Sequence, residues 1–409
     1  MTNSVLIGPF TQLLTMGKLA LKGALKDEQL ECIENAGILV VKGHIIEVGA
    51  FSALKSKASK IELIEGDAVC MPGLIDAHTH ICFAGSRAND YALRNAGKSY
   101  LEIAKAGGGI WDTVTKTRQA SQNDLVQGII KRANNHLKNG VTTIEVKSGY
   151  GLNVTEELKM LRAIKEANSI IATDLIPTCL AAHMKPKDWS GTSAEYLSTI
   201  SDELFPILKS ENLTQRIDAF IEESAFSSTE IAPYFTKAKA MNFDITVHAD
   251  QFSTSGSKTA VNFNAISADH LEASTEKEIQ ILAKSDVIPI ALPGASIGLG
   301  CDFTPARKLL DTGTSLVISS DHNPCSAPMG NLLAQAAILS TFEKLSNAEV
   351  LAGITTRAAT ALNLKNRGSL EKEKVADFIS YPVKNYQEIT YHQGQLKPNG
   401  VWKKGTKQL

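Results

Sequence analysis

Two histidines separated by one residue close an apolar run near residue 80. The run is Met71-Pro-Gly-Leu-Ile-Asp-Ala-His-Thr-His80, and residues two apart on a strand point to the same side. His78 and His80 are therefore expected to project together from the carboxyl end of one strand, where a metal ion could lie between them. The pair alone is a moderate indication, because two histidines can share a strand face by accident.

Single histidine or aspartate residues close three later apolar runs in the same manner. These runs are Ile245-Thr-Val-His248, Ile266-Ser-Ala-Asp-His270 and Leu316-Val-Ile-Ser-Ser-Asp321. Metal-ligating residue types that recur at strand ends are typical of a metallohydrolase on a β/α barrel, whose active site lies at the carboxyl ends of the strands. Three imidazoles and one carboxylate suit Zn²⁺ or an iron ion. The expected ligands are His78, His80, His248 and Asp321.

Such a site would carry out hydrolysis. A bound metal would lower the pKa of a water towards neutrality and polarise a carbonyl group. Asp321 could bind the metal and also take the proton of the attacking water, while His270 could bind a second metal or act as a proton shuttle. A second metal would need a bridging group, for which a carbamylated Lys147 is the candidate. Because an ammonium packed against Glu145 or aspartates is the simpler interpretation of Lys147, we expect one metal ion.

The central part of the chain alternates between strand-like and helix-like patterns. Between the apolar segments lie helical patterns, such as the stripe of Ile129, Ala133 and Leu137. This alternation favours a (β/α)8 TIM barrel, and the absence of a G-x-G-x-x-G after the first strand argues against a dinucleotide-binding fold. Eight segments are expected to be the barrel strands: Leu74–His80, Thr142–Lys147, Leu175–Ala182, Ile217–Glu222, Ile245–His248, Ile266–His270, Val287–Leu292 and Leu316–Asp321.

Both ends of the chain are rich in short strand-like segments. Residues 37–49 are expected to form two strands around a Lys42-Gly43 turn. Further strands are expected over 376–381, 388–392 and 401–402, and both ends should pair into one small β-sandwich, which would bring the termini together. The predicted class is α/β, with a sandwich domain of residues 1–69 plus 368–409 and a barrel of residues 70–367.

Composition and charge argue against several classes of function. The 409 residues include 42 Lys+Arg and 43 Asp+Glu, for a net charge of −1, which gives no electrostatic case for nucleic acid or an anionic membrane. No run approaches the roughly eighteen apolar residues of a membrane span, and no signal peptide is expected. The six cysteines form no C-x-x-C, so reduced thiols in a cytoplasmic protein are expected.

Several other polar residues have a predicted place. Arg87, if directed into the site, would bind a substrate carboxylate through two hydrogen bonds. His183 ends a strand-like segment and is expected to contact the substrate. Gly107-Gly-Gly109 lacks the lysine and hydroxyl residue of a P-loop, so we interpret it as part of a flexible lid. The histidines expected at the surface or in the sandwich are His44, His136 and His392.

Longer motifs along the barrel resemble a known family. They are Pro72-Gly-Leu-Ile-Asp-Ala-His-Thr-His80, Ala84-Gly-Ser-Arg87, Ile103-Ala-Lys-Ala-Gly-Gly-Gly-Ile110, Glu145-Val-Lys-Ser-Gly-Tyr-Gly-Leu152, His248-Ala-Asp-Gln251, Ser267-Ala-Asp-His-Leu271 and Ser320-Asp-His-Asn-Pro324. On these motifs the chain resembles the amidohydrolase superfamily and, within it, the imidazolonepropionase family. The resemblance implies hydrolysis of 4-imidazolone-5-propanoate to N-formimidoyl-L-glutamate, in histidine degradation, with one Zn²⁺ or Fe³⁺ per subunit.

The resemblance also implies a role for each site residue. It assigns metal binding to the four ligands above and catalysis to His270 and Asp321. Arg87 would meet the propanoate carboxylate of the small-molecule substrate, and the subunit would form a homodimer. Tyr150 and His183 would line the substrate ring. Gln251 and Ser326 would also contact the substrate, and Asn323 and Cys325 would contact the product.

Two positions depart from the family pattern. Gln251 stands where some relatives carry glutamate, and since a glutamine cannot act as a base, the proton must pass through Asp321 or His270. Cys325 stands where glycine is expected, and it can keep a backbone N–H contact if its φ is negative. His322, beside Asp321, is expected to make a supporting hydrogen bond.

Two other functions compete with this interpretation. The first is an aminohydrolase of purines or cytosine on the same ligand set, but a neutral base would not need Arg87 and Tyr150 as a carboxylate clamp. The second is a catalytically silent scaffold. Such proteins usually lose metal ligands, whereas all four expected ligands are present here.

Overall fold

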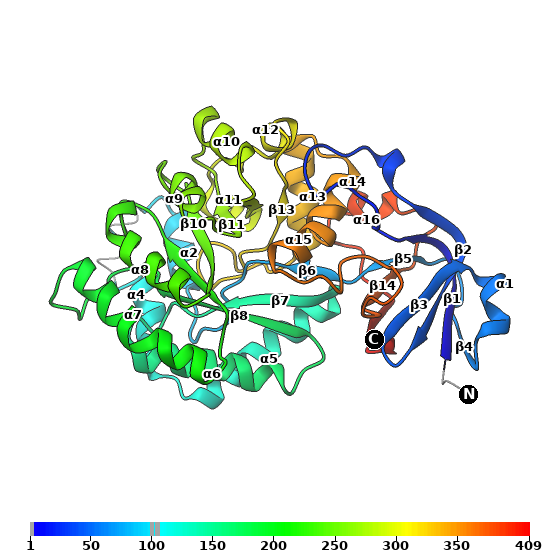
Figure 1. The fold of residues 1–409 in the computed structure, drawn as a ribbon, viewed down its shortest axis with the longest axis horizontal. Helices are drawn as coiled ribbons and strands as arrows, with labels where there is room; N and C mark the ends of the chain where they lie inside the picture. Colours follow the sequence, from blue (N-terminus) through cyan, green and yellow to red (C-terminus); the bar gives the residue numbers. More distant parts are fainter. Residues whose placement is uncertain (1–3, 99–101, 103–106) are drawn as a thin grey trace.

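The computed structural model describes residues 4–98, 102 and 107–409. Two sheets organise this part of the chain: a parallel barrel in the middle of the sequence and a mixed sheet built from the two ends (Figure 1). Residues 103–106, which belong to one of the family motifs, lie outside the described residues.

Eight parallel strands form the barrel, and each overlaps one of the expected segments. Their hydrogen-bonded order runs from β13 back to β6 in unbroken sequence order. Nearly all of their residues are buried, as expected of a parallel sheet covered on both faces. The barrel prediction is thus confirmed, with strands β6 (Leu74–Asp76), β7 (Val141–Lys147), β8 (Asp174–Ala182), β9 (Arg216–Phe220), β10 (Asp244–Ala249), β11 (Ser267–His270), β12 (Ile288–Ala291) and β13 (Val317–Ile318).

The first and last barrel strands meet through the residues that follow them. Thr79 and His322 form a parallel β-bridge. On either side of it, Asp321 N donates to His78 O at 3.1 Å, and His80 N donates to His322 O at 3.0 Å. Because these bonds use the backbone of three predicted ligands, closing the barrel also brings His78, His80 and Asp321 together at the carboxyl ends of the strands.

Helices follow the barrel strands and cover the wall from outside (Figure 1). In α5, Ser121 Oγ accepts from Asp124 N at the start, and Leu125, Ile129 and Ala133 are buried on one face. In sequence order the helices are α2 (Ala88–Asn95), α4 (Ile110–Gln119), α5 (Gln122–Lys138), α6 (Val154–Asn168), α7 (Ser193–Ser210), α8 (Ser228–Ala240), α9 (Gly256–Asn262), α10 (Glu276–Ala283), α11 (Pro293–Leu299), α12 (Ala306–Asp311), α13 (Leu332–Glu343), α14 (Asn347–Gly353) and α15 (Thr356–Ala361).

The two chain ends meet in one mixed sheet with a core of its own. Phe10, from the N-terminal end, packs edge-on against Phe378 and Trp402 from the C-terminal end, with ring centroids 6.3 Å away in both cases. The strands are β1 (Ser4–Leu14), β2 (Cys32–Val41), β3 (His44–Ala50), β4 (Lys60–Leu63), β5 (Val69–Pro72), β14 (Phe378–Tyr381), β15 (Gly400–Lys403) and β16 (Thr406–Lys407), with short helices η1 (Asp27–Gln29), α1 (Phe51–Leu54) and η2 (Lys55–Lys57).

One expected strand near the C-terminus is a helix. Residues 388–392 were predicted to be extended, but α16 (Gln387–Tyr391) occupies this segment. Glu388 Oε1 accepts from the backbone N–H groups of Lys384 and Asn385, which ties the residues before the helix to its first turn. Ile389 is the buried residue of the helix, so the segment lacks the alternating burial of a strand.

The aromatic core of the mixed sheet should contribute strongly to stability. Phe378 is fully buried and stacks on Trp402 at 4.8 Å between centroids. Phe378→Ala is expected to lower the free energy of unfolding by about 3–5 kcal/mol in urea denaturation, through lost burial and a residual cavity. Phe342→Ala, at a position that is 64% exposed, should cost less than about 0.5 kcal/mol. Equal effects of the two substitutions would contradict this packing.

Strand β5 runs across the expected domain boundary. It pairs with β1 and β14, so the mixed sheet includes residues on both sides of the boundary expected after residue 69, and the division of the chain into two domains stays a prediction.

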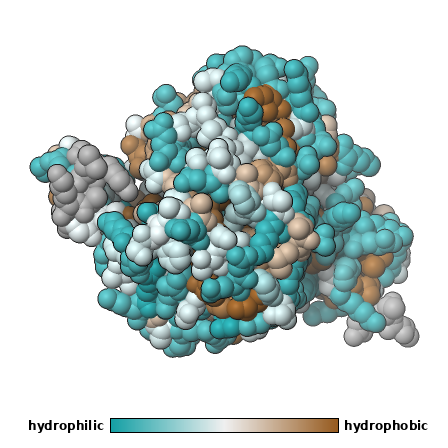
Figure 2. Space-filling model, turned by 60° about the vertical axis from the view of Figure 1, so that its left-hand side comes forward, coloured by the Kyte–Doolittle hydropathy of each residue, from teal (hydrophilic) through white to brown (hydrophobic). Residues whose placement is uncertain are grey.

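On the face drawn in Figure 2, hydrophilic side chains surround separate small apolar groups. Among the described residues, none of the helices has the length and apolarity needed to cross a membrane.

Candidate metal centre

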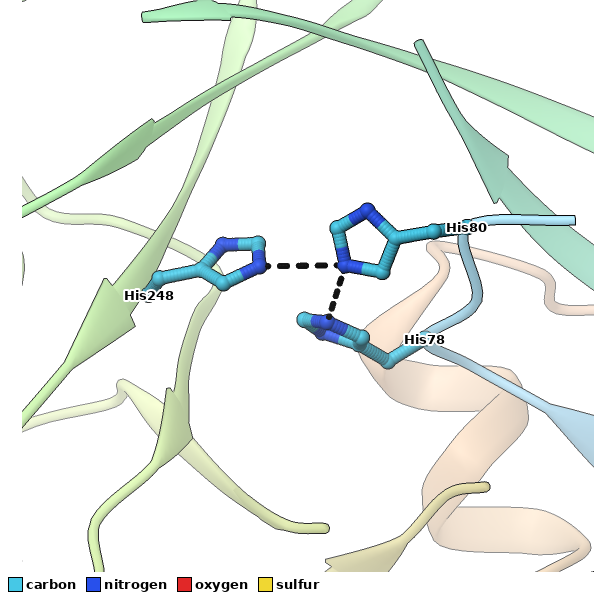
Figure 3. Close-up of side chains that lie close together, drawn as sticks. All are labelled: His78, His80 and His248. Carbon is cyan, nitrogen blue, oxygen red and sulfur yellow. Dashed lines mark hydrogen bonds between the residues drawn. The ribbon is translucent and has the colours of Figure 1, made fainter. Parts of the chain in front are cut away.

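Three buried histidines converge at the carboxyl ends of the barrel strands (Figure 3). His78 and His80 flank the bridge residue after β6, and His248 lies in β10. His80 Nε2 lies 3.2 Å from His78 Nε2 and 3.3 Å from His248 Nε2. The ligand atoms of the three residues all lie within 4.8 Å of one another, so the structure brings these three predicted ligands together.

Asp321 lies against two of these histidines, His78 and His80. Its Oδ1 is 3.6 Å from His78 Nε2 and 3.5 Å from His80 Nε2. Burial raises the pKa of this carboxyl to about 6. The backbone of Asp321 is left-handed, with φ of 52°, a conformation that costs energy for a residue with a side chain and that persists where the surroundings enforce it.

The tautomers of these histidines indicate that a cation belongs between them. His78 Nδ1 lies 2.6 Å from Asp269 Oδ2, and His248 Nδ1 lies 3.0 Å from Asp218 Oδ2. A carboxylate beside Nδ1 favours a proton on that nitrogen, which leaves a lone pair on Nε2. A neutral His80 can donate to one of these two lone pairs but not to both. A bound metal ion would accept the Nε2 lone pairs of all three histidines.

The spacing and protonation of the histidines also fit a metal. Nitrogen ligands about 2.0–2.1 Å from a tetrahedral zinc lie roughly 3.4 Å from one another, close to the observed 3.2 Å and 3.3 Å. Burial lowers the pKa of His78 and of His80 well below the usual value, and lowers that of His248 to about 3. The rings are therefore neutral, which is the state that binds metal.

Lys147 makes the contacts of an ammonium rather than of a metal bridge. Its Nζ lies 2.8 Å from Glu145 Oε1 and 2.8 Å from Asp218 Oδ2. Although burial opposes it, the negative charges of Asp218 and Glu145 raise the pKa of Lys147. A charged lysine in two ion pairs is not available for carbamylation, and this supports the expectation of a single metal ion.

His270 lies beside the metal ligands and is paired with its own acid. Its ring centroid is 5.8 Å from that of His78 and 5.3 Å from that of His248. Its Nδ1 lies 3.4 Å from Glu272 Oε1. Burial acts to lower the pKa of His270, but Glu272, together with the charges of Asp321 and Asp269, outweighs it, so the net pKa is raised. The ring is thus placed and tuned to carry a proton near neutral pH.

Tyr150 and His183 border the centre on the side of His80. The His183 ring stacks on that of His80 at 5.6 Å, and the Tyr150 ring lies 5.5 Å from that of His183. The backbone fixes His183, because its Nδ1 lies 2.9 Å from Gly149 O. These aromatic faces are suited to hold a flat ring next to the histidines.

Arg87 is buried next to the glycine-rich segment. Its Nε donates to Asp90 Oδ2 at 2.5 Å, and its Nη1 donates to Thr113 Oγ1 at 3.3 Å. Asp90 Oδ2 also accepts from Gly109 N at 2.9 Å. The guanidinium is therefore held in place on one side by a carboxylate. Its contact with a substrate and the closure of a lid by the glycine-rich segment stay predictions.

The loop after Asp321 is organised by Asn323. Asn323 Nδ2 donates to Asp321 Oδ2 at 2.8 Å, while Asn323 Oδ1 accepts from the N–H groups of Cys325 and Ser326, both at 2.8 Å. Cys325 is not among the residues with positive φ, so it meets the condition under which a cysteine can keep the backbone N–H contact expected of glycine. In this structure the Cys325 N–H donates to Asn323 Oδ1. Gln251 lies in the loop after β10, half-buried.

The expectation that His136 lies at the surface or in the sandwich is wrong. It lies in α5 with 1% of its area exposed, and its Nε2 is 2.8 Å from His322 Nδ1. Burial lowers the pKa of His136 to about 3 and that of His322 to about 4. Two neutral rings can share this hydrogen bond, so His322 does support the seam of the barrel, with another histidine as its partner.

Sequence reasoning missed the carboxylates that lie behind the metal ligands. Asp218 lies buried within β9 and Asp269 within β11, and each contacts the Nδ1 of a ligand histidine. A charged residue buried within a strand was the available signal, because such groups are retained when they are paired. Glu145 gave the same signal in β7, where its Oε2 accepts from Thr79 N at 3.2 Å.

A separate cavity of about 440 Å³ opens at the opposite end of the barrel. It is lined by Arg216 and Asp244, which begin β9 and β10. The histidines lie at the other end of these strands, so this cavity plays no part in the chemistry of the metal centre.

Comparison with known proteins relates this chain to one family. A model of the amidohydrolase family matches residues 69–407. An imidazolonepropionase of Bdellovibrio bacteriovorus is 37% identical over 98% of this chain and 96% of its own length, and one of Acinetobacter baumannii is 38% identical over 93% and 96%. An adenosine deaminase structure from Xanthomonas campestris with bound zinc has a TM-score of 0.72 at 18% identity, covering 99% of this chain and 92% of that one. The last likeness concerns the fold alone.

These matches agree with the geometry of the centre. The family match includes all eight barrel strands together with His78, His80, His248 and Asp321. The relatives match this chain over nearly its whole length. The chain therefore belongs to the amidohydrolase family and, within it, to the imidazolonepropionases.

Proposed function

We propose that this enzyme hydrolyses 4-imidazolone-5-propanoate to N-formimidoyl-L-glutamate in histidine degradation. The observation that carries the proposal is the convergence of three neutral histidines and one carboxylate at the end of the barrel, in a chain whose near full-length relatives are imidazolonepropionases. The buried Arg87 supports a substrate that has a carboxylate.

The proposed cofactor is one Zn²⁺ or Fe³⁺ per subunit, held by His78, His80, His248 and Asp321. When bound, such an ion would supply Lewis acidity, which lowers the pKa of a water and polarises a carbonyl. The neutral imidazoles and the buried acid are suited to either ion, so the ligand set does not select between them.

The substrate would lie between the metal ligands and the residues that border them. Arg87 would bind the propanoate group, and Tyr150 and His183 would pack against the imidazolone ring. Gln251 and Ser326 would contact the substrate, while Asn323 and Cys325 would contact the product. Asn323 already holds Asp321 and the loop around Ser326, which fits a role in shaping this side of the pocket.

Asp321 and His270 are the proposed proton carriers. Water adds to the ring carbonyl, the ring C–N bond breaks, and the released nitrogen must gain a proton. Asp321, whose pKa of about 6 is raised by burial, would take the proton from water and pass it to that nitrogen. His270 would donate a hydrogen bond to the carbonyl oxygen. Gln251 cannot act as a base, so these two groups are the ones available.

The identity of the product tests the proposed reaction. Purified enzyme, loaded with Zn²⁺ and mixed with fresh 4-imidazolone-5-propanoate, should convert it to N-formimidoyl-L-glutamate, as followed by mass spectrometry. Water labelled with ¹⁸O should place one labelled oxygen in the new carboxylate. A loaded enzyme that leaves this compound intact would remove the proposed substrate.

The pairing of His270 with Glu272 predicts a change in pH dependence. Glu272 raises the pKa of His270 against the effect of burial, so the protonated ring persists to higher pH than usual. Glu272→Gln should lower this pKa, and the alkaline fall of kcat/KM should therefore begin at a lower pH. The matched control is Glu276→Gln on α10, and an unchanged alkaline limb in Glu272→Gln would contradict the role of the pair.

The composition of the chain and the family resemblance support a cellular location and an assembly. Six free cysteines are consistent with a reducing compartment, and this supports a cytoplasmic enzyme. The near-neutral net charge argues against binding to nucleic acid or to an anionic membrane. A homodimer is proposed from the family resemblance. Sedimentation of the purified protein would test the dimer, since a monomer at micromolar concentration would contradict it.

A further inference from the structure

One buried lysine lies at the centre of the carboxylates beneath the metal ligands. Lys147 is 1% exposed, and Glu145, Asp218 and Asp269 are each 1% exposed or less. The Lys147 ammonium lies 2.8 Å from oxygens of both Glu145 and Asp218, and 3.8 Å from Asp269 Oδ2. Three carboxylates thus share one ammonium in a region with almost no access to water.

Two of these carboxylates hold two of the ligand histidines. Asp269 Oδ2 contacts His78 Nδ1 at 2.6 Å, and Asp218 Oδ2 contacts His248 Nδ1 at 3.0 Å. In both cases the oxygen that faces the histidine is the one that faces Lys147. The His248 contact is an ion-pair distance without the alignment of a hydrogen bond. His80 differs from both, because no carboxylate in the described part of the chain lies within ion-pair distance of its buried Nδ1. The imidazoles of His78 and His248 are therefore oriented by carboxylates that also contact Lys147.

We propose that Lys147 is a positioning residue that sets the affinity of the metal centre, by holding Asp218 and Asp269 against His248 and His78. The inference rests on the proposed metal site but not on the substrate. Without the ammonium, the buried carboxylates would repel one another, and a shift of Asp218 or Asp269 would cost a ligand histidine its orientation. Carboxylate partners of metal-bound histidines typically account for a factor of about 10–100 in affinity.

Lys147→Met tests this role, because methionine keeps much of the length of the side chain without its charge. The affinity for Zn²⁺ is measured by competition with a chromogenic chelator, which needs no substrate. The affinity is expected to fall by about 10- to 100-fold. Lys165→Met on α6 removes an ammonium that reaches Glu211 O at the surface, and this control should bind Zn²⁺ as the unmodified enzyme does.

A second variant removes the risk that unbalanced charge prevents folding. Lys147→Met combined with Glu145→Gln eliminates one carboxylate together with the ammonium, and it leaves Asp218 and Asp269 without their cation. Its affinity should stay low, whereas Glu145→Gln alone should remain close to the unmodified enzyme. Urea unfolding of the metal-free proteins separates loss of affinity from loss of fold.

Two results would overturn the proposal. One is a folded protein without the Lys147 ammonium, as single or double variant, that binds Zn²⁺ with unchanged affinity. The other is two zinc ions per subunit with an added carboxylate mass on Lys147, because the lysine would then be a ligand. An unmodified enzyme that binds Zn²⁺ but leaves imidazolonepropanoate intact would remove the proposed function without touching this inference.

Discussion

Replacing His248 by alanine is expected to remove both the metal and turnover. His248 Nε2 lies 3.3 Å from His80 Nε2, and its loss opens one side of the centre and leaves Asp218 without its imidazole. Since losing an outer partner of a metal site already costs about 10- to 100-fold, the loss of a ligand should reduce kcat/KM by more than this. Metal content by atomic emission and steady-state rates measure the two effects together.

His44→Ala is the matched control for this substitution. His44 is exposed at the start of β3 in the mixed sheet, so its replacement should leave metal content and rate unchanged. A His248→Ala enzyme with normal metal content and normal rate would eliminate the ligand assignment. Loss of metal in both variants would indicate a general effect on folding.

Replacing Arg87 by alanine is expected to weaken substrate binding while the metal is retained. Hydrogen bonds to charged groups are worth about 1.5–3 kcal/mol, so KM should rise by roughly 10- to 150-fold. The residue contacts Asp90 and Thr113 rather than any of the ligand histidines, and metal content should therefore stay at the level of the unmodified enzyme.

A substrate analogue separates recognition of the carboxylate from general damage. The propanamide of the imidazolone has no negative charge, so the unmodified enzyme should prefer the propanoate strongly. Arg87→Ala should lose most of this preference, and Arg87→Lys should keep part of it, because a lysine retains the charge without the two-pronged geometry. An Arg87→Ala enzyme that still discriminates as the unmodified one does would place the carboxylate elsewhere.

The sequence predicted the barrel and the convergence of His78, His80 and His248, because both follow local patterns. Several barrel strands lie in apolar runs that end in a histidine or an aspartate, and parallel strands have their carboxyl ends at one edge. The positions of His78, His80, His248 and Asp321 could therefore be predicted without the structure. The roles of Tyr150, Asn323 and Ser326 came from the family resemblance alone, since no periodicity marks them.

What the sequence could not provide depends on contacts between distant elements. Lys147 reaches Asp218 across the barrel from β7 to β9, and that contact follows from strand register and closure rather than from any local pattern. The pairing of His136 with His322 joins a helix end to the barrel seam, residues 186 positions apart. Residues 388–392 were misassigned because one turn of helix is too short to show a period.

Titration of the metal-free enzyme with Zn²⁺ tests the central claim most directly. The ultraviolet band of 4-imidazolone-5-propanoate should persist with chelated protein and disappear as metal is returned, with the rate rising linearly until one ion per subunit is bound. This is the result that a single His₃Asp centre predicts. A chelated, metal-free protein that consumes the substrate at the full rate would contradict the account, because the four converging ligands would then have no part in the reaction.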